Sequence, residues 1–231
     1  MLEEKRIYLP EERKQILEAL GLDIELVCPF TKEFASMAPE DFVKTILINQ
    51  LHAKHVIVGE DFRFGYKREG DVDRLNQYSL KYKFEVISYD KLTINNIIVS
   101  SSIIKEALSN GNIPQVSMYL GRDYSITGTV VTGKQLGRTI DFPTANILPC
   151  NHKIIPCDGA YETYVIIDNQ RYTSITNVGT NPTVTSSNER KIETYILNFN
   201  KDIYNSELTE EFFYINNTYS EEIETAIKAK R

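Results

Sequence analysis

The chain of 231 residues contains no tryptophan, three cysteines, three histidines and no long apolar run. Cys28, Cys150 and Cys157 are too few and too scattered for a disulfide framework, and their spacing around His152 matches no common zinc pattern. No stretch approaches the ~20 apolar residues that span a bilayer, and the N-terminus is charged throughout (MLEEKRIYLPEERK), unlike a secretory signal. We therefore expect a cytoplasmic protein with no membrane partner.

Positive charge is also scarce, since 26 lysines and arginines face 32 aspartates and glutamates for a formal net charge of -6. Nucleic-acid binders usually carry a basic patch, so we expect no nucleic-acid partner. An apolar content of 42% with mixed charges is typical of a globular chain rather than a disordered one. The length favours two small domains, and nothing in the sequence fixes the oligomeric state.

The first half of the chain alternates helix and strand signals. Apolar periodicity and capping residues predict helices over 10–20, 39–53 and 72–82, and strands over 24–28, 55–58, 84–88 and 97–99. Such alternation predicts a parallel sheet with crossover helices. Two short helices over 101–120 follow, and we place the domain boundary near Arg122, giving domains 1–122 and 123–231.

The second half reads as β-structure. From Tyr124 onward, short runs rich in Thr, Val, Ile and Tyr are divided by Gly, Asn and Pro. Six runs are predicted to be strands: SITGTVV, TANIL, AYETYVII, YTSITNV, KIETYILNF and LTEEFFYI. Many short strands at this spacing predict a closed or nearly closed antiparallel barrel, with a helix in the final SEEIETAIKAKR.

Chemistry is first suggested by the stretch from Gly128 to Asn146. It combines glycines, which let backbone N–H groups approach a polyphosphate, with cations that offset its charge. These residues are Gly128, Gly133, Lys134, Gly137 and Arg138. An ordinary glycine-rich hairpin with exposed cations has the same pattern, and neither a Walker loop nor a dinucleotide fingerprint is present. Both interpretations stay open.

Three polar strand residues are the next candidates. Thr144 and Asn146 lie two residues apart, so a strand places a hydroxyl and an amide on one face, suited to a hydrated Mg²⁺ with bound phosphates. A solvated Thr–Asn pair is the alternative. Glu193 lies in an apolar and aromatic strand, where its carboxylate either faces solvent or accepts a proton from a substrate hydroxyl.

These motifs resemble, in order and spacing, the riboflavin kinase domain, through GTVVTGKQLGRTIDFPTANI, GAYETYV, NVGTNPTV and IETYILNFNKDIY. Upstream, VIVGEDFRFGYKREGDV and VSSSIIKEALSNGNIPQVSMYLGRDYSITG resemble the adenylyltransferase half of the same bacterial enzyme. Along nearly its whole length the chain is therefore similar to the bifunctional riboflavin kinase/FMN adenylyltransferase (FAD synthetase) family.

The resemblance implies an incomplete Rossmann-like nucleotidyltransferase domain with a parallel sheet, followed by a six-stranded antiparallel riboflavin-kinase barrel. It implies transfer of the γ-phosphoryl group of ATP to the 5′-hydroxyl of riboflavin, giving FMN, with Mg²⁺ as cofactor. Thr144 and Asn146 would hold ATP and Mg²⁺, and Glu193 would be the catalytic base. Further implied contacts are Gly133, Lys134, Gly137 and Arg138 for ATP, and Asn177, Gly179, Thr180 and Pro182 for the flavin.

The chain also departs from the family. The adenylyltransferase half of the family normally opens with an H-x-G-H turn that binds ATP phosphates, and none of the three histidines forms one. Lys105 replaces the family's arginine, with loss of bidentate phosphate contact. We therefore expect little or no FMN adenylyltransferase activity and only a vestigial nucleotide site, made of Gly59, Asp61, Phe62, Gly65, Ser100, Ser101, Ser102 and Lys105.

The kinase half departs at Asp141, which stands where the family has glycine and adds negative charge beside the expected phosphate site. Two alternatives to an active kinase follow. One is a non-catalytic flavin- or nucleotide-binding remnant or paralogue. The other is an incomplete piece of a bifunctional enzyme.

Overall fold

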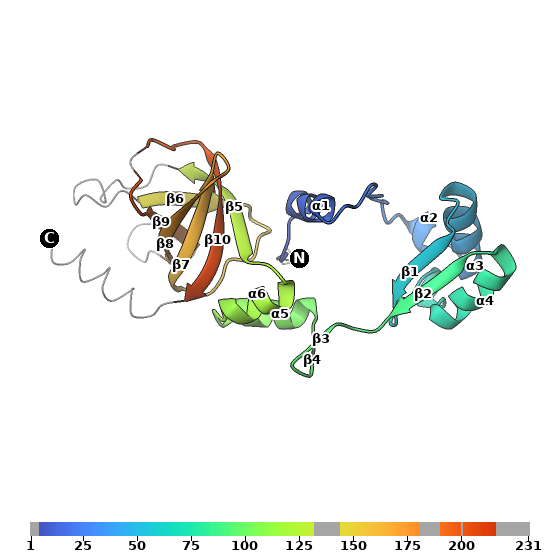
Figure 1. Cartoon of the computed structure of the whole chain (residues 1–231). Helices are drawn as coiled ribbons and strands as arrows, with labels where there is room; N and C mark the ends of the chain where they lie inside the picture. Colours follow the sequence, from blue (N-terminus) through green and yellow to red (C-terminus); the bar gives the residue numbers. More distant parts are fainter. Residues whose placement is uncertain (1–4, 132–143, 181–189, 200, 216–231) are drawn as a thin grey trace. The chain divides into compact units, whose positions relative to one another are not determined.

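The computed structural model divides the chain into two compact units (Figure 1). One unit is Gly21–Val99, and the other combines Met1–Leu20 with Ser100–Arg231. The contacts of the two helices within 101–120 therefore group them with the barrel. The boundary near Arg122 between the two family domains stays a prediction. The residues described are 5–131, 144–180, 190–199 and 201–215.

In the unit Gly21–Val99, a short parallel sheet packs against helices. Its elements are α2 (Lys32–Ala35), α3 (Pro39–Asp41), the π-helical η1 (Phe42–Gln50), β1 (His55–Gly59), the 3₁₀ turn η2 (Tyr66–Arg68), α4 (Val72–Tyr82), β2 (Glu85–Tyr89), β3 (Thr93–Ile94) and β4 (Ile97–Ile98). β1 and β2 pair in parallel, with His55 opposite Glu85 and Gly59 opposite Tyr89. The predicted parallel sheet with a crossover helix is confirmed.

The core of this unit consists of Val43, Phe64, Leu75 and Phe84, all buried. Asp71 fixes the start of α4 by accepting a hydrogen bond from the backbone N–H of Arg74 at 2.9 Å, which satisfies one otherwise unpaired helix donor. The cap and the apolar stripe of α4 therefore bring the sheet and helices together locally.

The prediction of a strand over 24–28 is wrong. The segment is in no strand, and Ile24 and Val27 are 74% and 77% exposed. β-Propensity describes how well a side chain fits a half-buried pleated surface, and it supplies no hydrogen-bonding partner. No described strand pairs with this segment, so its apolar composition alone does not make it a strand.

The second unit is a closed six-stranded antiparallel barrel with helices beside it. Its elements are α1 (Pro10–Ala19), α5 (Ser101–Ser109), α6 (Ile113–Leu120), β5 (Tyr124–Val131), β6 (Thr144–Pro149), β7 (Gly159–Ile167), β8 (Gln170–Thr180), β9 (Arg190–Ile196) and β10 (Glu207–Ile215). The strands close in the order β10-β5-β6-β9-β8-β7 (Figure 1). All six predicted strands and the barrel are confirmed, and closure leaves no free sheet edge.

A buried lysine holds the N-terminal segment against the barrel. Lys153 is fully buried, with Nζ 2.6 Å from Glu12 Oε2 and donating to the Ile7 carbonyl at 2.8 Å. Its ammonium group also lies 4.7 Å from the ring centroid of Tyr124. Burial lowers the pKa of Lys153, and the Glu12 carboxylate acts in the opposite direction. Among the described residues, no helix combines the length and apolar character needed to cross a membrane.

Candidate functional site

Three residues singled out for three separate reasons form one row across the barrel. Asn146 on β6 lies opposite Glu193 on β9, and Glu193 lies opposite Asn177 on β8. The strands are adjacent and antiparallel, so directly opposed residues have Cβ atoms about 5 Å apart. The proposed metal ligand, proton acceptor and flavin contact are therefore immediate neighbours.

All three side chains point away from the barrel interior. On β9, Ile192 and Thr194 are buried while Glu193 between them is half-buried. Asn146 likewise lies between the buried Ala145 and Ile147, and strand alternation places it on the outer face. The row is thus accessible to a ligand yet backed by a packed core.

Thr144 occupies the neighbouring row on the same face, where it is paired with Tyr195. Lys191, two residues before Glu193, also faces outward, is exposed and lies opposite Gly179. Sequence reasoning did not assign Lys191, although its i, i+2 spacing from Glu193 was the available signal. The outer face thus combines a hydroxyl, an amide, a carboxylate and a cation.

The other predicted kinase residues divide into two groups. Gly179 and Thr180 close β8 and pair with Lys191 and Arg190, so they lie beyond the row toward the strand end. The remaining ones lie outside the described residues: Gly133, Lys134, Gly137, Arg138 and Pro182, together with Asp141.

Gly128 has a packing role in the described structure. A Cβ at this position would lie 2.7 Å from Ile147 Cγ2 and 2.7 Å from the Leu148 carbonyl oxygen. Gly128 is buried on β5, where it lets β5 and β6 approach closely. The described structure therefore explains this glycine without a phosphate.

The outer face fits Mg²⁺ chemically. Thr144, Asn146 and Glu193 offer hard oxygen donors, which Mg²⁺ prefers, and Mg²⁺ usually keeps waters and substrate phosphates with one or two protein ligands. Among the residues described, no group of three or more His, Cys, Asp or Glu side chains could hold a metal by themselves. At Asn146, phosphate oxygens of a substrate would complete the coordination of a bound Mg²⁺.

Directly behind the row lies a buried polar cluster, which we call the hydroxyl–carboxyl network: Thr163, Ser174, Thr176, Thr194 and Glu210. Thr194 Oγ1 lies 2.9 Å from Glu210 Oε1, and Thr176 Oγ1 makes a short contact with the same oxygen. Burial raises the pKa of Glu210 to about 7, against the lowering effect of the threonine hydrogen bonds. Sequence reasoning missed this network.

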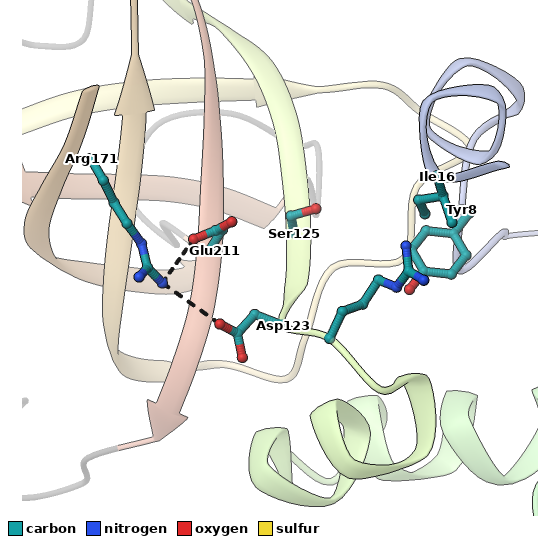
Figure 2. A pocket seen from close by; sticks show the side chains of 7 residues that line it. Tyr8, Ile16, Asp123, Ser125, Arg171 and Glu211 are labelled. Carbon is teal, nitrogen blue, oxygen red and sulfur yellow. Dashed lines mark ion pairs between the residues drawn. The ribbon is translucent and has the colours of Figure 1, made fainter. Parts of the chain in front are cut away.

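A separate pocket of about 520 Å³ lies elsewhere on the same unit (Figure 2). Arg171 bridges Glu211 at 2.9 Å and Asp123 at 3.6 Å, and Tyr8 and Ile16 line the opposite wall. Arg171 is six residues from Asn177 along β8, about 20 Å at the usual strand rise. Because Arg122 and Arg171 balance Asp123 and Glu211, the pocket offers little net charge to a ligand, and it is not the predicted site.

The predicted adenylyltransferase residues belong to both units. Gly59, Asp61, Phe62 and Gly65 lie in Gly21–Val99, at and after the carboxyl end of β1. Asp61 pairs with Lys91 at 3.1 Å, and the Lys91 hydrogen bond and charge lower the pKa of Asp61.

Two of these four residues have structural roles. Phe62 stacks on Phe64 with ring centroids 5.4 Å apart. Gly65 has a φ of 72°, and a Cβ there would lie 2.7 Å from Pro39. Neither role requires a nucleotide.

The rest of that predicted site begins α5 in the other unit. Ser100 caps the helix by accepting a hydrogen bond from the Ile103 N–H at 3.4 Å, and Ser101 and Ser102 form its first turn. Lys105 follows one turn later, half-buried. A helix N-terminus with hydroxyls suits an anion, but here Ser100 already satisfies one of its backbone donors.

Comparison with known proteins matches both halves of the chain. The family model described as FAD synthetase matches residues 2–103, and the one described as riboflavin kinase matches residues 120–218. A solved structure titled macrolide-efflux protein, from Streptococcus pneumoniae, superposes with a TM-score of 0.85 at 28% identity, covering 98% of this chain and 74% of that one.

Three curated relatives are each described as a bifunctional riboflavin kinase/FMN adenylyltransferase. The relative from Buchnera aphidicola of Acyrthosiphon pisum is 37% identical, and the match covers 86% of this chain and 64% of the relative. The relative from Buchnera aphidicola of Schizaphis graminum is 35% identical, and the match covers 91% of this chain and 68% of the relative. The Escherichia coli K12 relative is 33% identical over 84% of this chain and 61% of its own length. The chain thus spans about 64% of the length of the first of these relatives, and it belongs to the bifunctional riboflavin kinase/FMN adenylyltransferase family.

Proposed function

We propose that the barrel transfers the γ-phosphoryl group of MgATP to the 5′-hydroxyl of riboflavin, producing FMN and ADP. The register of Asn146, Glu193 and Asn177 on the outer face carries the proposal, because it brings into one row the residues proposed as metal ligand, proton acceptor and flavin contact. Membership of the riboflavin kinase family supports the same reaction.

In this reaction Glu193 accepts the proton of the ribityl 5′-hydroxyl, and the resulting oxygen nucleophile forms a bond to the γ-phosphorus. The bond from that phosphorus to the β–γ bridging oxygen breaks, and ADP leaves with the electron pair. Thr144 and Asn146 orient the phosphates and would hold Mg²⁺, which would offset the phosphate charge when bound. Lys191 on the same face adds a positive charge near the transferred group.

The test is direct product analysis. The protein is incubated with riboflavin and γ-labelled MgATP, and the products are separated by chromatography. We expect label to appear in FMN, and Thr144→Ala to raise the KM for ATP because a phosphate contact is lost. Flavin binding with no labelled FMN would favour the non-catalytic remnant and would overturn the kinase proposal.

We further propose that this chain by itself forms little or no FAD from FMN and ATP. The 231 residues contain no H-x-G-H motif, and Lys105 presents a point charge where a guanidinium would bind phosphate through two bonds. Asp61, the other charged member of the predicted nucleotide site, is engaged with Lys91. Robust FAD formation in the same assay with FMN as substrate would contradict this.

A further inference from the structure

The hydroxyl–carboxyl network lies inside the barrel, immediately behind the row proposed for catalysis. Thr194 follows Glu193 directly on β9, and Thr176 directly precedes Asn177 on β8. Thr176 and Thr194 are also paired across the two strands, as Asn177 and Glu193 are. Whatever holds the two threonines therefore holds the backbone that presents Asn177 and Glu193.

Glu210 is the member that ties these strands to the opposite wall. It is fully buried on β10, between Leu208 and Phe212 on the same inward face. Its Oε1 contacts both Thr176 and Thr194, on two strands that do not pair with β10. The contact thus crosses the barrel interior, where a hydrogen bond fixes relative positions that apolar packing leaves less specific.

A proton count sets the charge state of Glu210. Five oxygen–oxygen contacts connect the network: Thr163 with Ser174 and Thr176, Thr176 with Thr194, and Glu210 with Thr176 and Thr194. Each contact requires one hydrogen, and the four hydroxyl groups carry one each. A Glu210 protonated on Oε1 supplies the missing hydrogen, whereas an ionised Glu210 leaves two lone pairs facing each other.

The surroundings of Glu210 agree with the neutral form. From the other strands it faces Ile126 on β5, Ala145 on β6, Val165 on β7 and the hydroxyls of the network. The other buried titratable groups described have partners of their own. Tyr124 and Tyr161 donate to the carbonyls of Ile154 and Cys157, Tyr119 accepts from Gln115, and Lys153 pairs with Glu12. No described cation pairs with Glu210, and its Oε2 is buried without a partner.

We propose that protonated Glu210 is a positioning residue of the kinase site, which it acts on through Thr176 and Thr194. Its loss of the proton opens the network and displaces β8 and β9, so phosphoryl transfer becomes dependent on the charge of a residue that never touches substrate. The raised pKa of Glu210, about 7, puts this change near neutral pH. Only the catalytic consequence of this inference rests on the proposed function, and the structural coupling between Glu210 and the row does not.

Kinetics test that consequence. From pH 6 to 8.5 we expect the wild-type kcat for FMN formation to fall about tenfold, since a displacement well below ~1 Å already misaligns reacting groups. Glu210→Gln, whose amide keeps a donor and the side-chain shape, should lack this decline, whereas Glu210→Ala should have a low kcat at every pH with a nearly unchanged KM. Exposed Glu207→Gln on the same strand is the matched control and should follow wild type. Parallel pH profiles in wild type and Glu210→Gln would overturn the proposal.

A second measurement decides the structural half without catalysis. In protein with ¹³C-labelled glutamate carboxyls, we expect the resonance missing from Glu210→Gln to titrate near pH 7, and the amide signals of Glu193 and Asn177 to shift with the same midpoint. Those amide shifts should be absent in Glu210→Gln. If they are absent in wild type as well, Glu210 does not position the row. If they are present but no FMN forms, the proposed function fails and the coupling stands.

Discussion

Glu210 makes the stability of the barrel depend on pH in a direction opposite to that of an ordinary salt-bridged carboxylate. Its pKa is about 7 in the folded protein against an ordinary value of 4.5, so the folded state binds the proton more tightly than the unfolded state. The stabilisation is complete below the unfolded pKa and is lost as the pH rises through the folded pKa. The affected window therefore runs from about pH 4.5 to somewhat above pH 7.

The magnitude follows from the two pKa values. At pH 6 the protonated form of Glu210 outnumbers the ionised form about tenfold in the folded protein, whereas the unfolded protein is almost fully ionised. Proton binding therefore stabilises the folded state by about 1.4 kcal/mol at pH 6 and by only about 0.1 kcal/mol at pH 8. Glu210→Gln cannot titrate at this position. From pH 6 to pH 8, its free energy of unfolding should therefore fall by about 1.3 kcal/mol less than that of wild type.

Urea unfolding followed by far-ultraviolet circular dichroism at pH 6 and pH 8 measures this difference, and it suits a chain without tryptophan. Both values lie above the isoelectric point of about 5.3, so the net charge keeps its sign. Glu207→Gln, which removes an exposed carboxylate from the same strand, should behave as wild type. An identical pH dependence in wild type and Glu210→Gln would refute the assignment of a neutral Glu210.

Two further substitutions test the packing of the same unit by thermal unfolding. Lys153→Ala should destabilise by about 3–5 kcal/mol, because it leaves the Glu12 carboxylate, whose side chain is only 13% exposed, without its cation. Exposed Lys14→Ala should change little, and equal effects would contradict the Lys153–Glu12 pair. Gly128→Ala should cost about 1–3 kcal/mol, because its methyl group meets β6 at 2.7 Å, and Gly179→Ala, with its nearest neighbour at 3.8 Å, is the control.

Most of the fold was predictable because its elements have strong local signals. Alternation and turn residues located all six barrel strands, and helical periodicity located α1 and α4. The failure at 24–28 shows the limit of local signals, since a strand exists only where another strand pairs with it. Apolar residues can indicate that a segment is able to form a strand, but they do not supply its neighbour.

The residues of the candidate site could be proposed one by one from the sequence, and their roles stay a prediction, but their relative positions could not be predicted. Thr144, Asn146, Asn177 and Glu193 were identified from motifs, whereas their alignment depends on β6 and β8 flanking β9 in one register. Strand order in a barrel is a non-local property that periodicity does not carry.

The sequence contains a pattern that indicates a buried glutamate at position 210. Glu210 and Glu211 are consecutive in a predicted strand, and consecutive strand residues face opposite sides. One of the two carboxylates must therefore face the interior, and the neighbours Leu208 and Phe212 identify it as Glu210. Lys153 offered no comparable pattern, because it follows β6 outside any strand and its partner Glu12 is far away in the chain.

The central claim is that the outer-face row of Asn146, Glu193 and Asn177 performs phosphoryl transfer, and kcat for FMN formation in Glu193→Gln tests it most directly. Glu162→Gln is the matched control, because Glu162 is a half-buried glutamate on the outer face of the same barrel, on β7. We predict that Glu193→Gln lowers kcat about 100-fold or more, the usual effect of removing a general base, and that Glu162→Gln stays within about twofold of wild type. Equal kcat values in the two variants would contradict the account.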